Sequence, residues 1–341
     1  MKYFVQGAVA TGLFLFGLAI LVGFYAPSSE YTALNRVFLT VSPLFPALAG
    51  AGLVLSALAF KMGAVPFHSW APDAYETAPI ESAAFLASGP KLAAIGAASI
   101  FVTVVAAGVE AQRVLLVVAG LAVLSVLVGS VAALRQRDYR RLLAYAGIAQ
   151  SGYALIAIAL PMAPLAVLYG TTYALAAVGT FLAAAAFTRL RPEWDGSVAG
   201  LAGLGRQAPV LSGSLAVLLI SLSGLPPFLG FWAKLFVFAT GVTYAVGNLE
   251  FAPQLSWALG IAVGAGVLGS VVSLGYYSAI LRSLFFDSRE VDGQGDMQAA
   301  GERHSGGSAA LVVFVLALIV VALSVVPLVM GPGALLDVFS S

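Results

Sequence analysis

Nine long apolar runs divide this sequence and constrain its fold more than any other feature. A helix needs about 20 apolar residues to cross a bilayer, and the chain is 61% hydrophobic and only 9% charged. The sequence therefore predicts an all-α, multi-pass membrane protein with a single transmembrane helix bundle. The first run exceeds the roughly 7–15 residues of a signal-peptide core, so we include it as a spanning helix. The runs cover approximately residues 3–25, 43–64, 79–107, 114–134, 141–160, 163–188, 209–247, 255–285 and 309–330.

The seventh run, residues 209–247, is too long for one straight helix and is interrupted by Gly224-Leu-Pro-Pro227. Proline cannot donate to the helical hydrogen-bond ladder, and its ring clashes with the preceding turn. We therefore interpret this run as one discontinuous span. It has a half-helix over 209–223, a break, and a second half-helix over 228–247.

The basic residues support nine crossings with the N-terminus on the cytoplasmic side. Cytoplasmic connectors of membrane proteins hold most of the Lys and Arg residues. If residues 209–247 crossed twice, the basic residues of 282–303 would lie outside, against this rule. With nine crossings, the cytoplasmic segments contain Lys2, Arg135, Arg137, Arg140, Arg141, Arg189, Arg191, Arg206, Arg282, Arg289 and Arg303, and the outer loops contain Arg36 and Arg113.

Three lysines, Lys61, Lys91 and Lys234, lie inside the apolar runs. A charge at the bilayer centre costs at least ~2.5–3.5 kcal/mol, and such residues usually face a bundle interior or a path for ions or protons. Lys91 follows a Gly-Pro pair deep in its run, and Lys234 follows the proline break, where half-helix ends can bind ions. Lys61 lies near the cytoplasmic end of its run, where its long stem could carry the charge to the interface. We predict that these lysines relay protons; the alternative is that they only connect helices.

Hydroxyl and imidazole groups could connect or supply such a relay. His68 follows Lys61 in a Gly/Pro-interrupted segment, and the charge of a histidine switches near physiological pH. It is a candidate for proton uptake, with a structural role in the loop as the alternative. For the hydroxyls the alternative is a hydrogen bond between helices. The main hydroxyl candidates are Tyr153, Tyr173 and Tyr277, with Tyr145, Ser151, Tyr169, Thr171, Thr172 and Tyr276 also considered.

The composition argues against several other functions. The chain has no cysteine, which excludes disulfides and iron–sulfur ligation by thiolates. Its two histidines, His68 and His304, stand far apart with no metal-ligand spacing, and no Gly-rich loop has the context of a dinucleotide site. The net charge of +1 gives no sign of nucleic-acid binding. We therefore expect no cofactor or metal in this chain and no nucleic-acid partner.

Three segments together resemble the antiporter-like membrane subunits of respiratory complex I, NADH-quinone oxidoreductase. Within that group the subunit N branch is the most similar, because lysine at both Lys91 and Lys234 suits subunit N, whereas subunit M tends to carry a glutamate at the latter position. The resemblance covers nearly the whole chain. The segments are Lys61-Met-Gly-Ala-Val-Pro-Phe-His-Ser-Trp-Ala-Pro-Asp-Ala-Tyr-Glu-Thr-Ala-Pro79, Arg140-Arg-Leu-Leu-Ala-Tyr-Ala-Gly-Ile-Ala-Gln-Ser-Gly-Tyr153 and Gly224-Leu-Pro-Pro-Phe-Leu-Gly-Phe-Trp-Ala-Lys234.

The resemblance implies a fourteen-helix fold of two inverted five-helix repeats, each with a broken helix, of which this chain matches the last nine helices. It divides residues 1–341 into the remainder of the first repeat with the start of the second (1–134), the second repeat (135–285), a polar cytoplasmic loop (286–308) and a C-terminal helix (309–341). The family's first five helices are expected to be lacking, from a misassigned start or because the chain is a fragment.

The resemblance also implies that Lys61, Lys91 and Lys234 are the key, connecting and exit-side lysines of a hydrophilic axis that relays protons. The lysine at the position of Lys61 pairs in the family with a glutamate from the helices expected to be lacking. NADH, FMN, iron–sulfur clusters and quinone are implied in partner subunits, with this chain beside other complex I subunits in the bacterial inner membrane. The alternatives are a subunit of a multisubunit Na⁺/H⁺ antiporter or membrane-bound hydrogenase, and a structural scaffold.

Overall fold

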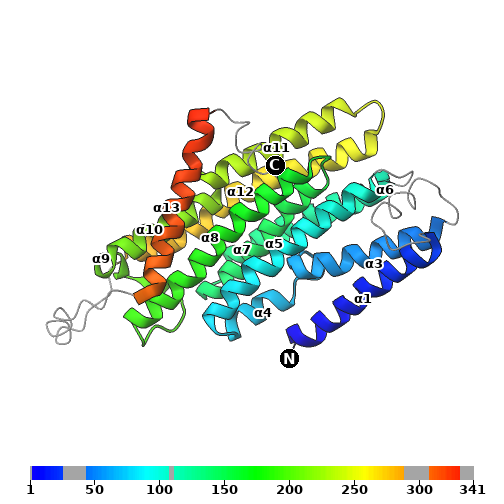
Figure 1. Ribbon diagram of the computed structural model, residues 1–341. Coiled ribbons are helices and arrows are strands. Elements are labelled where there is room, and N and C mark those ends of the chain that lie inside the picture. The colour runs from blue at the N-terminus through cyan, green and yellow to red at the C-terminus, as the bar shows by residue number, and fades with distance from the viewer. Residues whose placement is uncertain (1, 26–43, 107–110, 288–306, 331–341) are drawn as a thin grey trace.

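The computed structural model describes residues 2–25, 44–106, 111–287 and 307–330 (Figure 1). Within these ranges, nine helices are long and apolar enough to cross a membrane, which confirms the predicted multi-pass, all-α class. The long helices are α1 (Lys2–Tyr25), α3 (Leu44–Met62), α5 (Ile80–Val105), α6 (Ala111–Leu134), α7 (Tyr139–Ile158), α8 (Ala163–Leu190), α11 (Leu229–Gly247), α12 (Pro253–Phe285) and α13 (Gly307–Met330).

Four shorter helical segments complete the described part of the chain. They are α4 (Trp70–Thr77), the 3-10 turn η1 (Ala199–Leu201), α9 (Leu204–Gln207) and α10 (Pro209–Ser223). The interruption of the seventh run is confirmed, because α10 ends at Ser223 and α11 begins at Leu229. Of the predicted polar loop 286–308, residues 288–306 lie outside the described residues, as do Arg36, Arg289, Arg303 and His304.

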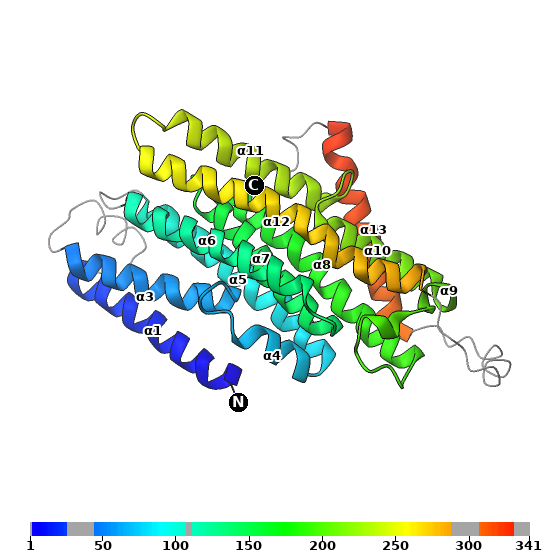
Figure 2. The ribbon, with the colours of Figure 1, turned by 180° about the vertical axis from the view of Figure 1, so that it is seen from behind.

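Helix α7 is the centre of the bundle. It contacts α4, α5, α6, α8, α11 and α12, and in both ribbon views α5–α8 lie between the α1–α3 pair and the α11–α12 pair (Figures 1 and 2). Small residues permit this packing. A Cβ added at Gly129 of α6 would lie 2.4 Å from the backbone nitrogen of Ala149, and one at Gly152 of α7 would lie 2.8 Å from the carbonyl oxygen of Ala122. Glycine at these positions lets two backbones approach within a distance that no other residue allows.

The two Gly/Pro interruptions are built alike. Gly63 after α3 and Gly224 after α10 both have a positive φ, of 68° and 85°. After each helix, the residue following the glycine donates its N–H to the carbonyl five residues back, as Ala64 does to Ala59. Such a left-handed glycine ends a helix and satisfies its last carbonyls. A proline lies three residues after each glycine, at Pro66 and Pro227.

Neighbouring helices satisfy the backbone freed by the first interruption. Trp70 Nε1 donates to the carbonyl of Phe60 at 2.9 Å, and Ser151 Oγ of α7 donates to that of Met62 at 2.6 Å. The N–H of Val65 donates to Ser125 Oγ of α6 at 3.0 Å. Irregular backbone is tolerated at membrane depth only when it is buried in protein or lines a cavity, and here Gly63, Ala64 and Val65 are buried.

The connector between α3 and α5 has more structure than the sequence indicated, because it contains α4. Arg141, at the start of α7, lies 2.6 Å from the carboxylate of Glu76 and 3.6 Å from that of Asp73 on α4. Arg140 donates to the carbonyl of Ala78 at 3.1 Å. These arginines, expected mainly to orient the chain in the membrane, therefore also attach α4 to α7.

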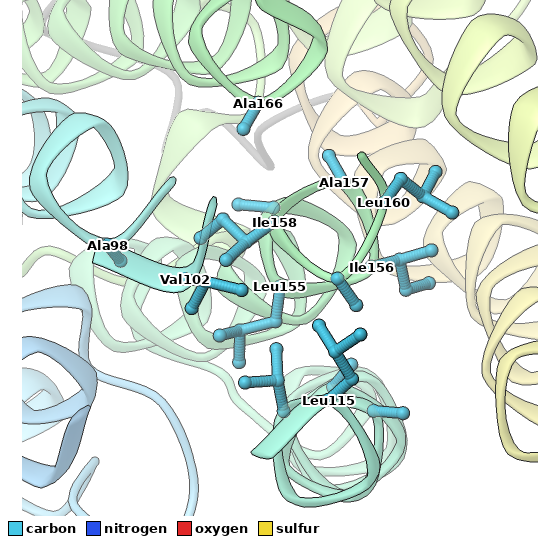
Figure 3. Packing of buried hydrophobic residues seen from close by; sticks show 14 of the residues in the cluster. Ala98, Val102, Leu115, Leu155, Ile156, Ala157, Ile158, Leu160 and Ala166 are labelled. Carbon is cyan, nitrogen blue, oxygen red and sulfur yellow. The ribbon is translucent and has the colours of Figure 1, made fainter. Parts of the chain in front are cut away.

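The end of α5, the start of α6 and the end of α7 form an apolar cluster. Figure 3 shows Val102 of α5, Leu115 of α6 and Leu155 and Ile158 of α7 side by side, and all of them are buried. The polar groups of α7 that are described next precede this cluster in the chain and end at Tyr153.

Candidate functional site

Lys234 lies where the break in the seventh run frees the end of α10. Its Nζ donates to the carbonyl oxygens of Leu222 at 2.9 Å and Ser223 at 3.0 Å, and the residue is only 4% exposed. The last carbonyls of a helix have no partner within the helix and carry its negative dipole end, which favours a cation there. Nζ also lies 4.6 Å from the ring centre of Tyr153, within the range of a cation–π contact. The predicted position of Lys234 beside a helix break is confirmed.

A close backbone approach brings α11 into reach of these carbonyls. Gly230, in the first turn of α11, donates its N–H to Ser221 Oγ at 3.1 Å. A Cβ at Gly230 would lie 1.8 Å from the carbonyl oxygen of Ser221, so only glycine fits here. The contact holds the start of α11 beside the last turn of α10.

Lys91 is buried at 1% exposure on α5, one residue after Pro90. Its Nζ donates to the carbonyl of Gly147 on α7 at 2.8 Å and lies 5.0 Å from the ring centre of Tyr173 on α8. The same carbonyl accepts a hydrogen bond from Ser151 Oγ at 3.0 Å. A Cβ at Gly147 would lie 2.9 Å from the Tyr173 hydroxyl, so glycine leaves room for both partners.

Neither Lys91 nor Lys234 forms an ion pair with a carboxylate of the described residues. Both are held by neutral carbonyls and aromatic rings. A buried charge without a counter-ion is costly. A lysine in such a setting can therefore exist either with or without its proton.

Gln150 of α7 lies between the two lysines. Its Nε2 donates to the carbonyl of Leu222 at 3.1 Å, which Lys234 also contacts. Its Oε1 accepts a short hydrogen bond from the Tyr169 hydroxyl of α8. The Tyr277 side chain of α12 also interacts with Gln150.

A small cavity lies beside Lys234 and extends to Tyr173. The space open to the centre of a water molecule is about 10 Å³, roughly what one water requires. Tyr173 lines this cavity and its ring centre lies 5.0 Å from Lys91 Nζ, so Tyr173 connects the surroundings of Lys91 with those of Lys234. The lining residues are Gln150, Tyr169, Thr172, Tyr173, Ser221, Leu222, Gly230 and Lys234.

The structure brings Tyr153, Tyr173 and Tyr277 to this site but not Lys61 or His68. Lys61 is in the last turn of α3, and its side chain is exposed. Its nearest link to the site is indirect, because the carbonyl of its neighbour Met62 accepts from Ser151. The sequence predicts one relay of three lysines; in the structure Lys91 and Lys234 are buried in the bundle, and Lys61 lies outside this site at the end of α3.

The main residue that sequence reasoning did not single out is Gln150. Its signal was present, because a buried carboxamide three residues after Gly147 and three before Tyr153 lies on the same helix face as both. Polar side chains in spanning helices usually bond to a neighbouring helix. What the sequence did not reveal was that the partner is the broken end of α10.

His68 lies between α3 and α4, outside the spanning helices, and burial lowers its pKa below the usual 6.5, with a hydrogen bond to the Pro66 backbone acting in the opposite direction. As pH falls through about 6.5, the unfolded chain gains a proton that the folded chain does not. The stability present at neutral pH is therefore lost on acidification. We expect the thermal unfolding midpoint of the detergent-solubilised protein to fall more between about pH 7.5 and 5.5 than that of His68→Gln. Parallel curves for the two proteins would contradict this assignment.

Among the described residues, no group of three or more His, Cys, Asp or Glu lies close enough together to hold a metal ion.

Comparison with known proteins gives related sequences along most of the chain. It is 37% identical over 294 residues to NADH-quinone oxidoreductase subunit N of Gluconacetobacter diazotrophicus, covering 84% of this chain and 58% of that protein. It is 33% identical over 339 residues to subunit N of Paramagnetospirillum magneticum, covering 96% of this chain and 64% of that protein. The chain thus spans less than two thirds of the length of these relatives.

Solved structures share the fold. A chain of respiratory complex I from Thermus thermophilus with bound Aureothin matches with a TM-score of 0.71 and 29% identity, over 97% of this chain and 67% of that one. A chain of the membrane-bound sulfane sulfur reductase, an archaeal respiratory membrane complex, matches with a TM-score of 0.80 and 24% identity, over 100% of this chain and 65% of that one. At that identity the second match shows the fold alone.

A family model described as NADH:quinone oxidoreductase/Mrp antiporter, TM, matches residues 1–260, which include both helix breaks, Lys91 and Lys234. Because this match covers most of the chain, the protein belongs to the NADH:quinone oxidoreductase/Mrp antiporter transmembrane family.

Proposed function

We propose that this chain relays protons through the membrane arm of an NADH:quinone oxidoreductase, in the role of subunit N. The observation that carries the proposal is the pair of buried lysines, Lys91 and Lys234, joined by Tyr173, Gln150 and a water-sized cavity. The names of the relatives and the structural likeness to respiratory complex I support it. NADH, FMN, iron–sulfur clusters and quinone belong to partner subunits in this proposal, and the complex lies in the bacterial inner membrane.

The relay follows from the contacts of the two lysines. Each amine is held by neutral acceptors, so it can release a proton to water in the cavity and take one up again. When both amines are protonated, their positive charges repel each other, and the low dielectric constant of the bundle interior strengthens this repulsion. Protonation of one lysine therefore favours release of the proton from the other lysine to the next group along the path. Lys61, exposed at the end of α3, is assigned to the uptake side of the same path, together with His68 in the segment that follows α3.

The Lys91→Ala and Lys91→Arg variants test the relay against a purely structural role. Arginine keeps the positive charge and its hydrogen-bond donors but does not release its proton under physiological conditions. In the assembled complex in proteoliposomes, we expect both variants to lower NADH-driven proton uptake by roughly 100-fold, as loss of a proton-transfer group commonly does. Arg206→Ala, which removes an exposed charge on α9, is the control and should pump normally.

If Lys91→Arg pumps at the normal rate while Lys91→Ala fails to assemble, the lysine is a structural connector and the relay is wrong. If both variants assemble and pump at the normal rate, the proposal fails altogether. The amount of assembled complex, measured on native gels, separates these results from simple misfolding.

A further inference from the structure

A second group of buried hydroxyls lies on the far side of Tyr153 from the cavity. Its members are Ser130 of α6, Tyr153 of α7 and Ser270 of α12, and their oxygens are buried. Tyr153 is fully buried and Ser130 is 2% exposed. The three residues come from three different helices, so this group exists only because α6, α7 and α12 pack together.

The three oxygens gather around Gly269 of α12. A Cβ at this glycine would lie 2.9 Å from the Tyr153 hydroxyl and 3.2 Å from Ser130 Oγ. It would also lie 2.4 Å from a methyl carbon of Val126, so the position is closed to any larger residue. Tyr153 interacts with both Ser270 and Ser130. Glycine at position 269 therefore allows the Tyr153 and Ser130 oxygens to lie against the backbone of α12.

None of these three oxygens makes a hydrogen bond of normal geometry to another group in the described part of the chain. Buried hydroxyls in proteins are nearly always bonded, and a bound water is a common partner of buried polar groups that lack one. Each hydroxyl can both donate and accept. The arrangement therefore has the chemistry of a water site, with enough partners to hold one molecule.

The site is adjacent to Lys234. The Tyr153 ring lies 4.6 Å beneath Lys234 Nζ, while the hydroxyl of the same ring faces Gly269. Ser273, one turn after Ser270 on α12, lies 3.5 Å from the Ser223 carbonyl to which Lys234 donates. Lys234 and the hydroxyl group are thus linked through the side chain of Tyr153, and Ser273 brings α12 to the same end of α10.

We propose that Ser130, Tyr153 and Ser270 bind a water molecule, and that this water extends the proton path beyond Lys234 toward the contact between α6 and α12. The idea rests on the proposed function for its proton source. The lysine gives up one proton and becomes neutral, and the water passes a proton on through the hydroxyls, so no electrons are exchanged.

Three variants test this site in the assembled complex. Tyr153→Phe removes the hydroxyl but keeps the ring beneath Lys234. Ser130→Val and Ser130→Thr have nearly the same shape, but only threonine keeps the hydroxyl. We expect Tyr153→Phe and Ser130→Val to lower proton uptake by roughly tenfold, less than loss of a direct transfer group, because water can partly replace a hydroxyl. Ser130→Thr should retain severalfold more pumping than Ser130→Val. Ser278→Ala, at an exposed serine of α12, is the control.

High-resolution cryo-electron microscopy of the complex supplies an independent measurement. Density for a water within hydrogen-bonding distance of the Tyr153 and Ser130 oxygens is the expected result, and a direct Tyr153–Ser130 bond without water would overturn the proposal. Equal pumping by Ser130→Thr, Ser130→Val and Tyr153→Phe would also overturn it. If Lys234→Met blocks pumping while these variants do not, only the water site fails; if Lys234→Met also pumps normally, the proposed function itself fails.

Discussion

Replacing Lys234 by methionine is expected to stop proton uptake by the assembled complex while leaving the helix bundle folded. Methionine has a similar length but cannot carry a proton, so the loss should be roughly 100-fold or more. The fold should survive because the Leu222 carbonyl still accepts from Gln150 Nε2 at 3.1 Å. The measurement is NADH-driven proton uptake in proteoliposomes, normalised to the amount of assembled complex.

The stability of Lys234→Met should change little for a physical reason. A hydrogen bond to a charged group typically contributes about 1.5–3 kcal/mol to stability, and Lys234 makes two of them, to Leu222 and Ser223. Their loss is offset because a buried charge is removed at the same time, and replacing buried ionic groups by apolar ones is often neutral. A large fall in the unfolding midpoint with normal pumping per complex would show that Lys234 acts as a helix cap and not as a proton carrier.

Gly230→Ala is expected to have the largest effect on folding. The added Cβ would lie 1.8 Å from the carbonyl oxygen and 2.7 Å from the carbonyl carbon of Ser221, and both are backbone atoms that cannot turn away. The end of α10 and the start of α11 must separate, which breaks the bond from Gly230 N–H to Ser221 Oγ. Overpacking a well-packed core commonly costs about 1–3 kcal/mol, and a main-chain clash should reach the top of that range or exceed it.

Gly213→Ala is the matched control, because it lies in α10 and a Cβ there meets no atom within 4 Å. Alanine in a helix interior is more favourable than glycine by roughly 0.5–1 kcal/mol, so this variant should be as stable as the parent or slightly more. Thermal unfolding of the detergent-solubilised proteins measures both. Equal midpoints for the two variants would show that the approach of α10 to α11 is looser than described.

Features that depend on a few neighbouring residues were predicted well from the sequence. The interruption at Gly224-Leu-Pro-Pro227 was expected because proline cannot continue a helix, and α10 and α11 end and begin beside it. The position of Lys234 next to that break follows from chain order alone. The helix at 70–77 was missed because the salt bridges from Arg141 that attach it come from α7, more than sixty residues away along the chain.

The burial of each polar side chain and the residues that it contacts could be determined only from the fold. The sequence placed Lys61 near a helix end and Lys91 deep in its run, but only the fold shows that Lys61 is exposed and that Lys91 is buried against α7. The sequence alone does not indicate a role for Gln150. Its role follows from the fold, because α10 places the Leu222 carbonyl within hydrogen-bonding distance of its side chain. Ser130, Tyr153 and Ser270 come from three helices, so no local pattern could have grouped them.

By itself, the sequence determined the class of the protein, its spanning helices, its broken helix and the presence of lysines within spanning segments, where a charge is costly. These follow from apolar length, proline chemistry and the cost of burying a charge, all of which act over short stretches of chain. Only the tertiary structure decided which lysines share one polar path, because a path is made by side chains that meet across helices. The glycines at 147, 230 and 269 set those meetings, since each leaves the space that a neighbouring amine, carbonyl or hydroxyl occupies.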